Sequence, residues 1–141
     1  MNKICFIIFI SFIFPLAILA QSKVEDCSKL KNGKFYLYTQ NHPIGYLIIR
    51  KDSIQEEVNL QTNDTSFWKV SWKNVCDFDF KFIRKSHPIS YDEQSFYNSH
   101  TTKCRVQKIE TDYYIFKGGL DSINNSSAVI DTIWFKPRKS F

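Results

Sequence analysis

Short runs in which every second residue is apolar or aromatic recur along most of this chain of 141 residues. In the clearest run, Phe78, Phe80 and Phe82 alternate with charged residues, and residues 67–72 repeat the pattern with two tryptophans and a valine. Successive side chains point to opposite faces of a β-strand, so a period of two predicts strands that bury one face. No stretch has apolar residues at helical spacing over several turns; residues 22–30 are predicted to form one short helical turn.

Turn residues such as Asn-Gly and Asn-Asp pairs separate the predicted strands. The strands cover residues 34–39, 44–50, 54–60, 67–72, 78–82, 104–109, 113–117 and 129–136. On the third of them, Ile54, Val58 and Leu60 share one face, and residues 85–103 and 118–127 are predicted to be long loops. An antiparallel meander of about eight strands with one apolar face must curl on itself or pair with a second sheet. The sequence therefore predicts an all-β fold, either a barrel or a strongly curled sheet.

Residues 1–20 have the pattern of a secretory signal peptide. Lys3 provides a positive charge, residues 4–19 are almost wholly apolar, and Ala20 is a small residue at the predicted cleavage point. The apolar stretch is about sixteen residues long, shorter than the roughly twenty that span a bilayer, and an uncleaved anchor is the alternative. We expect cleavage after Ala20, which would leave a single barrel-like domain at 21–141 with no stable membrane span. The expected location is extracytoplasmic, either periplasmic or secreted.

Charge and composition argue against several partners. The net charge of +5 at pH 7 is interspersed along the chain, with no run of Lys or Arg longer than two, so a nucleic-acid surface is not expected. The three histidines (His42, His87 and His100) are scattered over predicted loops, and no Cys-x-x-Cys pair is present. The four glycines do not form a phosphate-binding loop. We therefore expect no metal and no cofactor.

The cysteines predict one disulfide. Cleavage after Ala20 would remove Cys5 and leave Cys27, Cys76 and Cys104, and two of three should pair in an oxidising compartment. Three pairings are possible. We expect Cys27 to pair with Cys76, because each lies just before a predicted strand. Cys104 begins a strand after a long loop and is expected to be free or buried.

Candidate catalytic groups are sparse. The dipeptides Ser86-His87 and Ser99-His100 each place a hydroxyl beside an imidazole in sequence. A catalytic serine needs its base and a third orienting group close in space, and it commonly lies on a strained turn. Both dipeptides fall in the predicted loop 85–103, where solvent-exposed residues are the simpler interpretation. We expect a protein that is not an enzyme.

Two elements resemble those of known proteins. Cys27 precedes Asn-Gly-Lys-Phe at 32–35, and Trp-Lys-Asn-Val-Cys follows at 72–76. This order resembles a group of small exported bacterial proteins of unknown function with lipocalin-like folds, over about residues 27–82 and more loosely over 104–135. The resemblance implies a lipocalin-like barrel and implies no catalytic residue.

A fainter likeness connects the chain with true lipocalins. These carry Gly-x-Trp on the first strand and Thr-Asp-Tyr in a later hairpin. Here residues 33–35 read Gly-Lys-Phe and residues 111–113 read Thr-Asp-Tyr. Phe35 replaces the tryptophan, and no arginine follows the second motif closely.

Aromatic residues make up 16% of the chain, which is a large share for one small domain. Such rings can fill a core or line a pocket inside a barrel. The candidate ligand-binding residues are Tyr36, Tyr38, Tyr46, Trp68, Trp72 and Trp134. We expect an exported, non-enzymatic protein that binds a small apolar or amphipathic ligand. The alternative is a structural or protein-interaction module of the cell envelope with a filled core.

Overall fold

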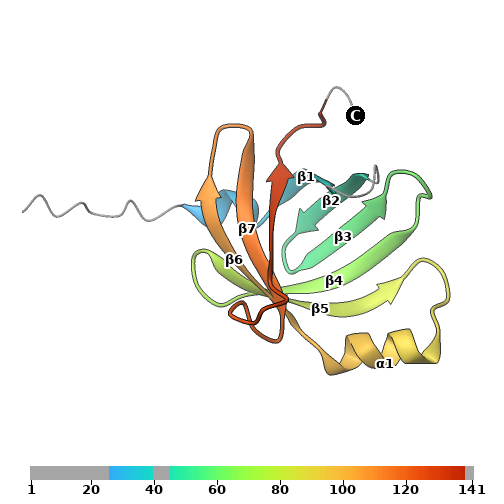
Figure 1. Ribbon diagram of the computed structural model, residues 1–141. Coiled ribbons are helices and arrows are strands. Elements are labelled where there is room, and N and C mark those ends of the chain that lie inside the picture. The colour runs from blue at the N-terminus through green and yellow to red at the C-terminus, as the bar shows by residue number, and fades with distance from the viewer. Residues whose placement is uncertain (1–25, 40–44, 139–141) are drawn as a thin grey trace, which may run out of the picture.

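The computed structural model describes residues 26–39 and 45–138. The predicted signal peptide at 1–20 lies outside the described residues. Eight antiparallel strands follow one another around a closed barrel, and the last strand pairs with the first (Figure 1). This arrangement confirms the predicted all-β meander and shows that the sheet closes.

The elements have the following bounds. The strands are β1 (Gly33–Tyr38), β2 (Gly45–Lys51), β3 (Ile54–Asn59), β4 (Thr65–Trp72), β5 (Asp77–Lys85), β6 (Thr102–Ile109), β7 (Tyr113–Leu120) and β8 (Val129–Trp134). A 3-10 helix, η1 (Cys27–Leu30), precedes β1, and an α-helix, α1 (Tyr91–Ser99), lies between β5 and β6.

The alternation in the sequence determines which side chains enter the barrel. Val70 of β4 and Phe78 and Phe82 of β5 are buried, whereas their charged neighbours in sequence point outward. Phe78 lies opposite Cys104 of β6 in the ladder, so the buried row continues around the wall. Burying apolar side chains on one face of every strand supplies the driving force for closing the sheet.

The two ends of the barrel differ. At the end here called the η1 end, η1 leads into β1, and Cys27 and Leu30 are fully buried. Because every strand runs antiparallel to its neighbours, the connection containing α1 and the connection 121–128 both lie at the opposite end, here called the α1 end. His100, just after α1, contacts Asp121 of the second connection, with Nδ1 and Oδ2 2.6 Å apart.

Helix α1 differs from the prediction of a long loop over 85–103. Its N-terminus is capped by Ser90, whose side-chain oxygen accepts a hydrogen bond from the backbone N–H of Glu93. Asp92 and Glu93 lie in the first turn, where carboxylates interact favourably with the helix dipole. No residue of α1 is buried, so the sequence lacks the apolar repeat by which a helix is usually detected. The short helical turn predicted at 22–30 is present as η1.

The predicted disulfide is confirmed. Cys27 and Cys76 are bonded, with their Cα atoms 5.3 Å apart, and Cys104 is free and buried. The bond joins η1 to the turn between β4 and β5, and both lie at the η1 end. Over the described residues, no helix combines the length and the apolar character needed to cross a membrane.

Candidate functional site

Strand β3 brings polar side chains into the barrel, contrary to the simplest interpretation of its sequence. The aliphatic residues of this segment face outward, and Ile54 and Leu60 are 38% and 48% exposed. The opposite face carries Gln55, which is 1% exposed, and Glu57, which is half-buried. The polar row of β3 therefore faces the interior.

These side chains form a hydrogen-bonded chain that begins at Arg50 of β2. The Arg50 Nε and Nη2 groups donate to Gln55 Oε1 at 2.8 and 2.5 Å, and Nη1 donates to the carbonyl oxygen of Leu30 in η1 at 2.7 Å. Gln55 Nε2 then donates to Glu57 Oε1 at 2.7 Å. A buried charge needs such partners to offset the loss of hydration. The network thus links η1 to the middle of the barrel.

Aromatic rings enclose the Arg50 guanidinium. Its Cζ atom lies 5.1 Å from the ring centroid of Phe78, 5.4 Å from that of Phe35, and 5.8 Å from those of Trp72 and Phe80. A guanidinium over ring faces gains a cation–π attraction that grows as water is excluded. Arg50 is only 2% exposed. Side chains therefore fill the half of the barrel near η1.

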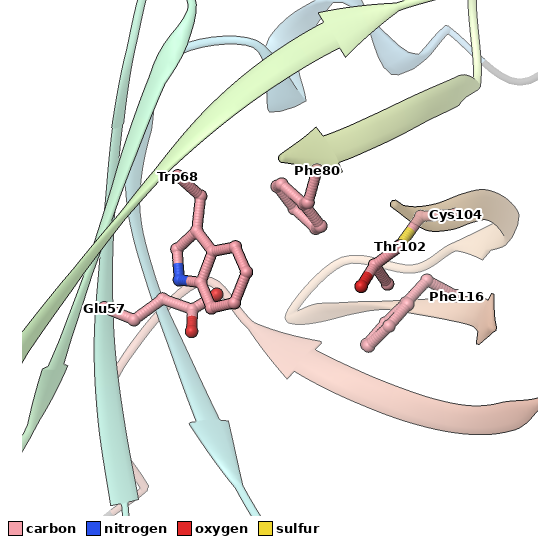
Figure 2. Close-up of a pocket in the computed structure, with 6 residues that line it drawn as sticks. All are labelled: Glu57, Trp68, Phe80, Thr102, Cys104 and Phe116. Carbon is pink, nitrogen blue, oxygen red and sulfur yellow. The ribbon is translucent and has the colours of Figure 1, made fainter. Parts of the chain in front are cut away.

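A cavity of about 230 Å³ remains in the half near α1. It is lined by Glu57, Trp68, Phe80, Thr102, Cys104 and Phe116 (Figure 2). In Figure 2, Glu57 and Trp68 lie on one side, and Thr102, Cys104 and Phe116 lie on the other. Three aromatic rings thus surround a space that only a few polar groups enter, which is the usual composition of a small-molecule site.

The carboxyl group of Glu57 is the ionisable group best placed to act in this cavity. Burial raises its pKa above the ordinary value, while the donors on Gln55 and Trp68 and the positive charge of Arg50 favour the ionised form and offset part of that rise. The indole nitrogen of Trp68 faces the Glu57 carboxylate (Figure 2). This N–H is buried and has no well-aligned hydrogen-bond partner. Both groups are therefore only partly satisfied within the described residues.

A pH series on Glu57→Gln tests this environment. The folded pKa of Glu57 lies above the value of 4.5 for an unperturbed glutamate, so the folded protein holds this proton more tightly than the unfolded chain does. The group therefore lowers stability as the pH rises from about 4.5 through the folded pKa. We expect the urea midpoint of Glu57→Gln, relative to wild type, to be higher at pH 7 than at pH 3.5.

Glu56→Gln is the matched control for this series. It removes the same charge from the adjacent residue, on the outer face of β3. A wild-type advantage over Glu57→Gln that grows between pH 3.5 and 7 would contradict the assignment of Glu57 to a desolvated position.

Cys104 lines the cavity as a thiol. Burial raises its pKa to about 12. A thiolate is the reactive form of cysteine, so at neutral pH this residue is a small apolar wall group and a poor nucleophile.

Helix α1 packs against the part of the barrel that forms the cavity wall. The ring of Tyr97 stacks on that of Phe82, with centroids 4.4 Å apart, and makes a T-shaped contact with Trp68, with centroids 5.6 Å apart. Lys85 Nζ and Glu93 Oε1 are 2.6 Å apart and fasten the helix to the end of β5. Trp68 thus packs against both Tyr97 of the helix and Phe82 of β5.

Three of the six predicted ligand-binding residues are on the inner face. Trp68 lines the cavity. Trp72 packs beside Arg50 in the filled half, with its ring 4.6 Å from that of Phe78. Tyr46 is on the same face of β2 as the buried Ile48, near the α1 end.

The other three, Tyr36, Tyr38 and Trp134, are on the outer face. They alternate with the inward residues of β1 and β8, where Phe35 and Ile133 are buried. Tyr36 lies opposite Trp134 in the ladder that closes the barrel. These three side chains do not line the cavity.

Sequence reasoning missed most of the residues that do line it, namely Glu57, Phe80, Thr102, Cys104 and Phe116. The inward position of Phe80 could have been predicted, because apolar and charged residues alternate regularly along its strand. The inward position of Glu57 could not, because the aliphatic residues of β3 lie on the other face of the strand and suggested that their face was buried.

Two of the three histidines, His87 and His100, fall within the described residues and lie on the surface, and His42 lies outside them. His87 Nδ1 is 3.2 Å from Asp64 Oδ1, with side chains 46% and 50% exposed. His100 pairs with Asp121, and the adjacent Ser99 hydroxyl donates to the carbonyl oxygen of Ser95 instead of to an imidazole. Neither histidine lines the cavity. In residues 26–39 and 45–138, no group of three or more His, Cys, Asp or Glu side chains is arranged to hold a metal ion.

Comparison of the chain with family models, with curated proteins and with solved structures found no match.

Proposed function

We propose that this protein is an exported, non-enzymatic binding protein that holds one small apolar or amphipathic ligand in the α1 half of its barrel. The observation that carries this proposal is the cavity of about 230 Å³ between three aromatic rings. The other half of the barrel is filled around Arg50. A barrel needed only as a scaffold gains stability when its whole interior is packed.

The size of the cavity limits the ligand. An apolar cavity of about 150 Å³ holds one benzene molecule, and sites for drug-sized ligands begin at about 300 Å³. A volume of about 230 Å³ therefore suits a single ring with a short substituent. It is too small for a long-chain lipid in this conformation.

Two further observations support the remaining parts of the proposal. The signal-like residues 1–20 and the Cys27–Cys76 disulfide both suit an oxidising compartment outside the cytoplasm. Inside the cavity, the Cys104 thiol is held protonated, and no imidazole of the described residues lines the cavity beside Glu57. These groups do not make a nucleophile with its base.

Fluorescence titration tests ligand binding. We expect 2-phenylethanol to change the emission of Trp68 saturably, at one molecule per chain, because that indole forms part of the cavity wall. A variant with Trp72→Phe and Trp134→Phe retains Trp68 as its single tryptophan and isolates the signal. Isothermal titration provides the stoichiometry.

Two single substitutions serve as controls. Trp134→Phe removes a tryptophan on the outer face and should leave the affinity unchanged, whereas Thr102→Phe places a ring in the cavity and should abolish binding. If Thr102→Phe folds and binds as wild type does, the ligand lies elsewhere and the proposal is wrong.

A patch on the outer face favours the second candidate, a protein-interaction module. Tyr113 and Trp134 have ring centroids 5.0 Å apart, and the Arg138 guanidinium lies 4.8 Å from the Trp134 ring. Aromatic and arginine side chains are enriched in protein interfaces. This function would replace ligand binding if the cavity bound no small probe.

A further inference from the structure

We infer that the ligand of this cavity is a small organic cation, a protonated amine carried on an aromatic or short aliphatic group. This inference rests on the proposed binding function and specifies its chemistry. It follows from three observations: a carboxyl group that lines the cavity, aromatic walls around it, and a guanidinium that is buried and already hydrogen-bonded.

The hydrogen-bonded chain fixes how Glu57 is presented. Gln55 directs its carbonyl oxygen to Arg50, so its amide N–H groups face Glu57 and occupy Oε1. The Trp68 indole N–H faces the same carboxylate without good alignment, and Glu57 lines the cavity. An ammonium group in the cavity would add a charge-assisted hydrogen bond to this carboxylate.

The aromatic rings that line the cavity also favour a cation beside Glu57. Trp68, Phe80 and Phe116 surround the cavity with Glu57 (Figure 2). Ring faces attract a cation that has been removed from water, and tryptophan does so most strongly. The apolar part of the ligand would contact the same rings, and the Thr102 hydroxyl can accept a second hydrogen bond from the ammonium group.

The described part of the cavity wall suits an anionic ligand less well. Arg50 is buried inside the barrel, and its donors already serve Gln55 and the carbonyl oxygen of Leu30. The ring of Phe80 lies against the guanidinium and also forms part of the cavity wall. A ligand carboxylate would therefore meet the Glu57 carboxyl group, and none of the described residues that line the cavity carries a positive charge.

A second carboxyl group adds to the negative character of this half. Asp131 of β8 lies opposite Phe116 in the ladder and on the same face as the buried Ile133. It is half-buried, and its Oδ1 accepts a hydrogen bond from the backbone N–H of Thr132 at 2.7 Å. Asp131 thus adds a second carboxyl group to the inner face of the wall next to Phe116.

Three probes of nearly equal size distinguish the charge of the ligand: phenethylamine, 2-phenylethanol and phenylacetate. By isothermal titration at pH 7 we expect phenethylamine to bind about tenfold more tightly than 2-phenylethanol, as one charge-assisted hydrogen bond provides. Phenylacetate should bind most weakly. In Glu57→Gln, the amine should lose this advantage over the alcohol.

The controls separate this inference from the proposed function. Glu56→Gln removes the same charge from the outer face of β3 and should keep the preference for the amine. If the alcohol binds and the amine binds no more tightly, the cation inference is wrong and the binding function stands. If the preference for the amine survives in Glu57→Gln, Glu57 is not its cause. If none of the three probes binds, the proposed function fails together with the inference.

Discussion

Replacing Arg50 by methionine is expected to lower the free energy of unfolding by about 3 kcal/mol or more, the range for removing one partner from a buried polar network. The change leaves Gln55 Oε1 and the Leu30 carbonyl oxygen without their donors in the filled half of the barrel. It also removes the positive charge that favours the ionised form of Glu57. Urea unfolding at pH 7 should show a lower midpoint with an unchanged slope.

Arg84→Met is the matched control. Arg84 also lies over a ring, that of Phe67, with Cζ 3.8 Å from the centroid, but it is exposed on the outer face. Its loss should cost less than about 1 kcal/mol, as for an exposed cation–π pair. Equal midpoints for the two variants would contradict the role assigned to Arg50.

A double variant tests the mechanism of the Arg50 effect. Adding Gln55→Leu to Arg50→Met removes the acceptor that the first change leaves unpaired. Removing both members of a buried polar pair costs less than the sum of the two single changes. We expect the double variant to be less destabilised than the sum of the single variants predicts.

The strands could be predicted because their signal is local. In β5, the alternation of Phe78, Phe80 and Phe82 with charged residues appears in any window that contains it. The inner face of β3 could not be predicted in this way, because its residues Gln55, Glu57 and Asn59 are all polar, whereas the outer face carries the aliphatic residues. That face is set by the ladder with β2, in which Arg50 lies opposite Gln55. Such pairing is not visible in either segment alone.

The same difference between local patterns and strand pairing explains which residues of the candidate site could be predicted. Residue type indicated that aromatic side chains would line the ligand pocket. Only the alternation along each strand decides whether a given ring points into the barrel or outward. Tyr36 follows the buried Phe35 and therefore points outward, whereas Trp68 shares its face with the buried Val70. Glu57 has no local signal of this kind. Its place in the cavity depends on contacts between β2, β3 and β4, as does the chemistry inferred from it.

Replacing Cys27 and Cys76 together by serine is expected to lower the free energy of unfolding by about 4 kcal/mol, the chain-entropy value for a loop of this length. The two cysteines are 49 residues apart in the sequence, so the bond removes much of the freedom of the unfolded chain. It also holds η1 in place, and the Leu30 carbonyl oxygen of η1 accepts a hydrogen bond from Arg50. Urea unfolding of the double variant and of wild type, with and without reductant, measures this effect.

Reductant should lower the midpoint of wild type and leave that of the double serine variant unchanged, because Cys104 is free and offers no second bond. A wild-type midpoint that does not move on complete reduction would contradict the expected contribution of the bond.

Loss of the disulfide should affect ligand binding much less than it affects stability. The disulfide lies at the η1 end and the cavity lies in the α1 half, with the filled region around Arg50 between them. Under conditions where the double variant is fully folded, we therefore expect its affinity for 2-phenylethanol to stay within about threefold of wild type, as for distant and independent sites.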